Sequence, residues 1–304
     1  MNVVIIGAGA LGAYFGGRLL EGGENVTFLV REKRARQIEE HGMKITSPKG
    51  DYHIDNPRVE TDVTQIGDVD LVLVSVKGYH VQGTMDSLKV LTNKEAYVLP
   101  VLNGIEHVSL LQERLGKDFV LGGLSFIIAT LNEAGHVIHS SDFDNLIFGP
   151  LQPNQKNICH DLENALKKTT VMERNTENIL AELWKKYTFI TAFSGVTTAT
   201  NLPIGPIREE QDTFRIAEMI LHEMKDLAKA YNVEVKDKEI EAAIKKLRAL
   251  PAEATSSMHQ DRRKGLMLEV DHLHGGAIRL AKAVGVQMPY TEAVHGLIKP
   301  FENR

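Results

Sequence analysis

Apolar and polar positions come in blocks along the first half of the chain. Val3 to Ile6 form an unbroken apolar run, which is expected of a central parallel strand buried on both faces. A stretch with helical spacing follows and stops at Gly22-Gly23, and a second apolar run covers Val26 to Val30. Similar runs occupy 69–76, 96–102 and 119–128. We therefore predict an open α/β sheet of parallel strands.

The pattern changes between Thr130 and Phe148. Residues 131–139 (LNEAGHVIH) resemble a hairpin with its turn at Asn132 to Gly135, and Asn145 to Gly149 add a short strand. We predict that these strands are antiparallel and extend one edge of the parallel sheet, which is a common addition to such sheets.

Strand signals nearly vanish from about residue 158 onward. Helical spacing covers 162–168, 176–200, 213–231, 236–250, 266–284 and 291–301. The second half is therefore predicted to be all-helical. We place the boundary between residues 165 and 175, which gives domains of about 1–168 and 169–304.

A glycine-rich turn joins the first apolar run to the first helical stretch. Residues 7–12 read Gly-Ala-Gly-Ala-Leu-Gly, which matches G-x-G-x-x-G. In this motif the first glycine allows a tight turn, the second lets a pyrophosphate approach the backbone, and the third lets helix and strand pack closely. The pyrophosphate sits on the N–H groups that begin the helix. Strand, turn, helix and second strand follow in order, so a dinucleotide site of Rossmann type is favoured over a purely structural turn. Its candidate residues are Gly7, Gly9, Ala10, Leu11 and Gly12.

The end of the second apolar run indicates which dinucleotide binds. An NAD site usually places an acidic residue there to accept from the ribose 2′-hydroxyl, but this chain has Arg31, with Lys33, Arg34 and Arg36 close behind. A guanidinium can hold a 2′-phosphate through charge-assisted hydrogen bonds. We predict NADP(H). The alternative is a solvated basic helix face, which accounts for Arg36.

Composition narrows the class of protein. The 304 residues suffice for two cores, and 43% hydrophobic with 25% charged residues is ordinary for a globular protein. A net charge of −5 argues against general binding to nucleic acid or anionic membranes. Cys159 is the single cysteine, which excludes an internal disulfide and fits a cytoplasmic protein. No apolar stretch approaches a membrane span, the first strand leaves no room for a signal peptide, and no histidine pattern indicates a metal site.

Polar residues follow two of the predicted strands. Lys77 comes directly after the run 69–76, and Asn103 comes directly after the run 96–102. Open α/β sheets bind ligands beyond the carboxyl ends of their strands, so both are candidates for a nicotinamide pocket. The alternatives are an exposed strand-end lysine and a simple Asn-Gly turn.

The helical half contributes further candidates. Lys186, Ile190 and Ser194 are spaced four apart and share one face of a helix. Ser257 lies in TSSMHQD, where it either contacts a ligand or forms a capping box with Gln260. Glu269 lies on an apolar stretch, where a carboxylate either faces solvent or pairs with a buried cation. The pair Gly275-Gly276 indicates that another backbone or a ligand comes close.

Taken in order, these motifs resemble the ketopantoate reductase (2-dehydropantoate 2-reductase) family over nearly the whole chain. They are the G-x-G-x-x-G turn, the lysine of VSVKGYH, the Leu-Asn-Gly of LPVLNGIEH, the Trp-Lys-Lys of the long helix, and the SSMHQD segment followed by a glutamate. The resemblance implies a Rossmann domain joined to a helical domain, with substrate held between them. It also implies NADPH-dependent reduction of ketopantoate to pantoate, on the route to pantothenate and coenzyme A.

The resemblance assigns roles to individual residues. Lys186 matches the general acid, and Glu269 matches a carboxylate that positions the substrate and interacts with that lysine. Ser257 matches a serine that holds the substrate carboxylate. Lys77 and Asn103 match residues that line the nicotinamide and substrate pocket. A nearby ammonium suits hydride transfer, because it can stabilise and protonate the oxygen on which charge develops.

The chain departs from the family at two positions of this pocket. The better-studied enzymes have asparagines four and eight residues after the catalytic lysine, whereas this chain has Ile190 and Ser194. Reduction of another small 2-keto acid or carbonyl compound therefore stays open beside ketopantoate. A non-catalytic NADP(H) sensor is a second alternative, although it needs neither Lys186 nor Glu269. A homodimer through the helical domain is a further hypothesis.

Overall fold

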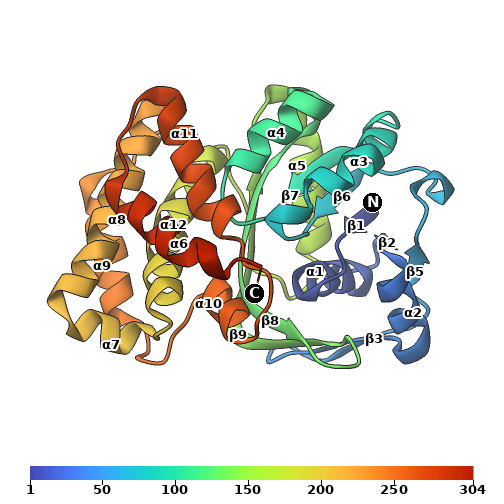
Figure 1. Cartoon of the computed structure of the whole chain (residues 1–304). Coiled ribbons are helices and arrows are strands. Elements are labelled where there is room, and N and C mark those ends of the chain that lie inside the picture. The colour runs from blue at the N-terminus through green and yellow to red at the C-terminus, as the bar shows by residue number, and fades with distance from the viewer. Residues whose placement is uncertain (304) are drawn as a thin grey trace. The chain divides into compact units, whose positions relative to one another are not determined.

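The computed structural model describes residues 1–303, which form two compact units (Figure 1). The first unit contains Met1–Leu102 and His107–Ile179, and the second contains Asn103–Glu106 and the chain from Leu180 onward. The division falls after Ile179 rather than after residue 168, because a short strand at Glu173–Asn175 still pairs with the first unit. The loop Asn103–Glu106 is a further part of the second unit that the pattern of the sequence did not indicate.

The first unit contains a five-stranded parallel sheet in the order β5-β2-β1-β6-β7. Its strands are β1 (Asn2–Ile6), β2 (Asn25–Leu29), β5 (Arg58–Glu60), β6 (Leu71–Val74) and β7 (Tyr97–Pro100). The order reverses at β1, since the chain first adds strands on its β2 side and then on its β6 side. Such a switch point is where open α/β sheets bind ligands. The predicted α/β class is confirmed.

A second sheet in this unit was not predicted as such. It joins β10 (Glu173–Asn175), β9 (Val137–Gly149), β3 (Met43–Thr46) and β4 (Tyr52–Ile54), and β8 (Gly122–Leu131) pairs with β9. The hairpin turn is confirmed, because the Gly135 N–H donates to the Asn132 carbonyl at 2.9 Å. Its placement at the edge of the parallel sheet was wrong.

The hairpin was misplaced because the apolar run 119–128 predicts a further strand of the parallel sheet. Most of that run instead forms β8, which runs antiparallel to β9 from Gly122 opposite Gly149 onward. Only an isolated bridge between Val98 and Val120 continues the parallel sheet. A Cβ on Gly123 would lie 2.5 Å from Leu99 and 2.8 Å from the Pro100 carbonyl. The two sheets therefore pack closely where β8 crosses β7, which buries the run without making it a parallel strand.

The helices of this part of the chain are α1 (Ala10–Glu21), α2 (Glu32–His41), α3 (Met85–Thr92), α4 (Glu106–Leu115) and α5 (Lys156–Leu166). Helix α1 packs directly on the sheet, since a Cβ on Gly16 would lie 2.6 Å from Phe28 and 2.9 Å from Ile5. This close approach holds the start of α1 beside the end of β1, where the glycine-rich turn lies.

The second unit is helical over its described residues, as predicted. Its helices are α6 (Ile179–Thr200), α7 (Ile204–Glu209), α8 (Gln211–Ala230), α9 (Asp237–Ala249), α10 (Ser257–Arg263), α11 (Gly276–Val284) and α12 (Pro289–Ile298). Helix α6 is the core of this unit: Trp184, Tyr187 and Val196 are buried, and so are Thr191 and Thr197. A helix that is buried on most of its circumference is typical of a domain centre.

The predicted helix at 266–284 begins later than expected. Residues 266–269 are not helical, and the Leu268 N–H donates to the Glu302 carbonyl at 2.9 Å. The helix starts at Val270 with a π-helical turn at Asp271–Gly275, here called the π-turn, and continues as α11. Glu269 therefore immediately precedes the helix instead of lying on it.

Residues 1–303 include no helix that is both long and apolar enough to cross a membrane. Within the same range, no three His, Cys, Asp or Glu side chains are grouped to hold a metal ion.

Candidate active site

The glycine-rich turn lies at the carboxyl end of β1, and two of its glycines are sterically required. Gly7 has φ of +96°, and a Cβ there would lie 2.9 Å from the Val76 nitrogen. A Cβ on Gly12 would lie 2.2 Å from the Gly7 carbonyl oxygen and 2.3 Å from Ser75 Oγ. The Ser75 hydroxyl donates to that same carbonyl at 2.7 Å. The turn is thus fixed against the end of β6, which the sequence motif alone did not show.

Gly9 differs from these two because it is exposed and a Cβ there would have no atom within 4 Å. It is the N-cap of α1, no side chain caps the helix, and its first turn has no acidic residue. The N–H groups of Ala10, Leu11 and Gly12 have no carbonyl of the preceding turn to bond. An open, uncapped helix N-terminus of this kind suits the diphosphate of a dinucleotide.

The basic residues after β2 have separate tasks. Arg31 is exposed at the N-cap of α2, with its Nη2 atom 3.4 Å from His80 Nδ1. Arg34 turns back into the unit, donating to the Ala8 carbonyl at 3.0 Å and to the Gly135 carbonyl at 2.8 Å, and burial lowers its pKa. Arg36 is 79% exposed. Arg31 therefore lies where a ribose phosphate is expected, while Arg34 supports the glycine-rich turn from behind.

Lys77 follows β6 and is half-buried. Because β1 and β6 are parallel neighbours, with Ile6 opposite Val74, their carboxyl ends share one edge of the sheet. Lys77 and the glycine-rich turn accordingly lie at the same edge, as the sequence predicted. Asn103 follows β7 but belongs to the second unit, where its carbonyl accepts from His272 at 2.8 Å.

Lys186 and Glu269 come together within the second unit. Lys186 is partly buried in the middle of α6, and the Glu269 side chain is buried. Burial lowers the pKa of Lys186 to about 8, because desolvation penalises the ammonium, while the negative charge of Glu269 raises it. A lysine poised near neutral pH beside a carboxylate is suited to proton transfer.

The neighbouring lysine shows the contrast. Lys185 pairs with Glu239 at 2.7 Å and with Glu182 at 3.5 Å, and the hydrogen bond that it donates to Glu239 raises its pKa. Lys185 is thus an ordinary ion-pair residue. The pKa values of the two adjacent lysines are shifted in opposite directions, up for Lys185 and down for Lys186.

Ile190 and Ser194 follow Lys186 at helical spacing on α6. Ile190 is half-buried and Ser194 is buried. Residues four apart lie on one face, so an alkyl group and a hydroxyl follow the ammonium along that face.

Ser257 is the exposed first residue of α10 and is not its cap. The cap is Ser256, whose Oγ accepts from the His259 N–H at 3.1 Å and lies 3.0 Å from Thr197 Oγ1 of α6. The capping box considered for Ser257 is therefore wrong, because the neighbouring serine caps the helix. Contact of Ser257 and Asn103 with a substrate stays a prediction.

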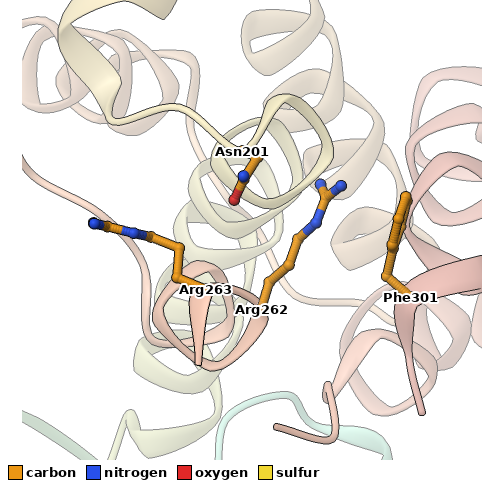
Figure 2. Close-up of a pocket in the computed structure, with 4 residues that line it drawn as sticks. All are labelled: Asn201, Arg262, Arg263 and Phe301. Carbon is orange, nitrogen blue, oxygen red and sulfur yellow. The ribbon is translucent and has the colours of Figure 1, made fainter. Parts of the chain in front are cut away.

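A separate cavity of about 490 Å³ lies at the C-terminal end of α6, lined by Asn201, Arg262, Arg263 and Phe301 (Figure 2). The Arg262 guanidinium stacks 4.0 Å from the Phe301 ring centre and donates to the Ala199 carbonyl at 3.2 Å. With a rise of 1.5 Å per residue, the end of α6 is about 20 Å along the axis from Lys186. This cavity is not part of the Lys186 site.

Comparison with known proteins supports the resemblance noted in the sequence. The family model described as ketopantoate reductase PanE/ApbA matches residues 3–153, and the model of its C-terminal part matches residues 178–302. YkpB, an uncharacterised oxidoreductase of Bacillus subtilis, is 32% identical over 302 residues, covering 99% of each chain. A 2-dehydropantoate 2-reductase of Halobacterium salinarum is 28% identical over 306 residues, covering 98% of each chain.

Solved structures of the same fold support the same family. The PanE/ApbA family ketopantoate reductase of Ralstonia eutropha is 26% identical with a TM-score of 0.89, covering 100% of this chain and 99% of its own. A D-mandelate dehydrogenase solved with NADH and anilino(oxo)acetate has the same fold, with a TM-score of 0.89 at 21% identity over 100% of this chain and 99% of its own. The chain belongs to the ketopantoate reductase family of oxidoreductases.

Proposed function

We propose that the protein reduces a small 2-keto acid with NADPH, and that ketopantoate, which would give pantoate, is the leading substrate. The observation that carries this proposal is the pairing of the partly buried Lys186 with the buried carboxylate of Glu269, with the Lys186 pKa lowered to about 8. A protein that only senses a dinucleotide needs no such pair, so the non-catalytic alternative is disfavoured.

The first unit would hold the cofactor. Gly7, Gly9 and Gly12, with the N–H groups of Ala10 and Leu11, form an open cradle for a diphosphate, and Arg31 offers a guanidinium to a 2′-phosphate. When bound, the reduced nicotinamide supplies the hydride. Lys77, at the same edge of the sheet as the glycine-rich turn, would lie beside the nicotinamide.

The second unit would supply the acid. Lys186 Nζ would donate its proton to the substrate oxygen as negative charge develops there. With a pKa of about 8, roughly nine in ten of these side chains carry the proton at neutral pH. Glu269 would stabilise the ammonium and orient it, and the exposed Ser257 hydroxyl would bond the substrate carboxylate.

Ile190 and Ser194 favour a second candidate within the same reaction class. An isoleucine cannot hydrogen-bond a substrate hydroxyl, so a 2-keto acid with an apolar side chain competes with ketopantoate for this site. The solved D-mandelate dehydrogenase has the same fold, and its name refers to a hydroxy acid other than pantoate.

The direct test is NADPH oxidation by the purified protein against a panel of 2-keto acids. The panel should contain ketopantoate, branched and straight alkyl 2-keto acids, and an aryl 2-keto acid. Turnover of ketopantoate with the highest kcat/KM supports the leading proposal, and a preference for an apolar 2-keto acid supports the second candidate. NADPH binding without oxidation by any member of the panel would refute both.

A further inference from the structure

We propose that His272, within the π-turn, is a positioning residue that holds Asn103 in place for the reaction. This inference rests on the proposed function, because the position of Asn103 matters to the reaction only if Asn103 contacts the substrate or the nicotinamide. His272 was not among the residues that the sequence singled out as a candidate.

The contact itself is specific in geometry. His272 Nε2 lies 2.8 Å from the Asn103 carbonyl oxygen, so that nitrogen carries the hydrogen and donates it. The next residue, Gly104, has φ of +85°, and a Cβ there would lie 3.3 Å from the same His272 nitrogen. The turn after Asn103 therefore packs directly on the imidazole and leaves little room for a side chain.

The far end of the loop Asn103–Glu106 is held by the same helix. The Arg279 guanidinium of α11 donates to both Glu106 carboxylate oxygens, at 2.8 Å and 2.7 Å. It also donates to the Asp271 carboxylate and carbonyl, each at 3.1 Å. A two-pronged arginine contact of this kind fixes orientation as well as distance. Both ends of the loop are thus tied to the π-turn or to α11.

The π-turn is tied in turn to α6. The Tyr187 hydroxyl donates to the Leu273 carbonyl, and His274 Nε2 lies 2.9 Å from the Thr191 carbonyl oxygen. A Cβ on Gly276 would lie 3.2 Å from the Glu106 carboxylate and 3.4 Å from the Tyr187 hydroxyl, so side chains approach this glycine rather than the backbone or ligand expected from the sequence. Since His272 and His274 are two residues apart, they point to different neighbours, one to the loop and the other to α6.

These contacts connect three of the candidate site residues. Glu269 lies two positions before the π-turn. Lys186 is next to Tyr187 on α6, and Asn103 is next to Gly104 in the loop. A π-turn shifts the helical register by one residue and is often found at functional sites. Here it lets one short segment contact α6 on one side and the loop on the other. Displacement of the π-turn would move Asn103 relative to the Lys186–Glu269 pair.

If His272 only stabilised the fold, its replacement would lower activity by the same factor whether or not the Asn103 side chain is present. A double-mutant cycle distinguishes that role from the positioning of Asn103. The cycle combines His272→Phe, which keeps a ring but removes the donor, with Asn103→Ala, which removes the side chain that the contact is proposed to position. His272→Gln retains an amide donor of similar reach and serves as the conservative rescue. Lys282→Ala, an exposed change on α11, is the control.

We expect His272→Phe to lower kcat/KM for the 2-keto acid about tenfold, the equivalent of one hydrogen bond. His272→Gln and Lys282→Ala should stay within about twofold of the starting protein. In the Asn103→Ala background, adding His272→Phe should cost less than about twofold, because nothing is left to position. Full additivity of the two changes would overturn the proposal.

Hydrogen exchange of the amides in residues 104–106 gives a readout that needs no substrate. His272→Phe should speed this exchange about tenfold, and His272→Gln should not. Unchanged exchange in His272→Phe would reject the positioning role even in an active enzyme. If the starting protein reduces no 2-keto acid, the proposed function fails, while the exchange result still decides whether His272 holds the loop. Should His272→Phe fail to fold, Arg279→Gln loosens the other end of the loop and is expected to give the same two results.

Discussion

Glu269 lies close enough to Lys186 for its negative charge to raise the pKa of the ammonium, which opposes the lowering of that pKa by burial. The two residues are far apart in the sequence, and one is in the middle of α6 while the other precedes the π-turn. A proton donor needs to be charged at working pH and yet release its proton readily, and the balance of these two effects achieves that.

Replacement of Lys186 by alanine should therefore remove the acid without disturbing the glycine-rich turn. We expect Lys186→Ala to lower kcat by about 100-fold or more while leaving the Kd for NADPH almost unchanged. Steady-state kinetics and a fluorescence titration of NADPH measure the two quantities. Lys185→Ala is the matched control, since Lys185 adjoins it but pairs with Glu239 at 2.7 Å. Near-normal turnover in Lys186→Ala would show that another group protonates the substrate.

The pH dependence of turnover should follow the protonation of Lys186. The reduction needs the charged ammonium, so kcat should decline as pH rises through about 8. In Glu269→Gln the stabilising charge is lost and burial remains, so the pKa of Lys186 falls and the decline moves to lower pH. At pH 8 we expect this variant to turn over about tenfold more slowly than the starting protein. Glu292→Gln, an exposed change on α12, controls for loss of a carboxylate. A decline that stays at the same pH in Glu269→Gln would contradict the coupling.

Much of the first unit could be predicted from sequence because the relevant signals are local. The run Val3 to Ile6, the glycine-rich turn and the run Val26 to Val30 follow one another within a single βαβ segment. Helix α6 was likewise predictable from its spacing. The second sheet was not, because an unbroken apolar run cannot reveal whether its partner is parallel or antiparallel, and β3, β4 and β10 are too short to show a period.

The candidate site was less accessible to sequence than the fold. The pairing of Lys186 with Glu269 came from the family resemblance and not from any pattern in the residues themselves. The contact of His272 with Asn103 spans 169 positions, and no periodicity reports on such a distance. Serine capping was misjudged by one residue, since TSSMHQD contains two adjacent serines and only the geometry shows that Ser256 accepts from His259.

Cofactor preference should depend on Arg31. A 2′-phosphate would gain charge-assisted hydrogen bonds from its exposed guanidinium, and NADH has no such group to offer. We expect Arg31→Ala to raise the Kd for NADPH about 10- to 100-fold and the Kd for NADH by less than about twofold. Arg36→Ala is the control, because Arg36 is 79% exposed on the same helix. An equal loss for both cofactors would remove the argument for NADPH.

Two glycines of the turn should respond differently to the same substitution. A Cβ on Gly12 would lie 2.2 Å from the Gly7 carbonyl oxygen, whereas a Cβ on Gly9 would have no protein atom within 4 Å. Gly12→Ala should therefore lower the free energy of unfolding by about 1–3 kcal/mol, because backbone must move. Gly9→Ala should leave the unfolding transition unchanged, since φ at Gly9 is −72°, and yet raise the Kd for NADPH about tenfold or more by occupying the space that a diphosphate needs. Thermal unfolding and NADPH titration separate the two effects, with Gly67→Ala, an exposed position also free of neighbours within 4 Å, as the control. If Gly9→Ala binds NADPH as tightly as Gly67→Ala does, the open space at the start of α1 is not where the diphosphate lies.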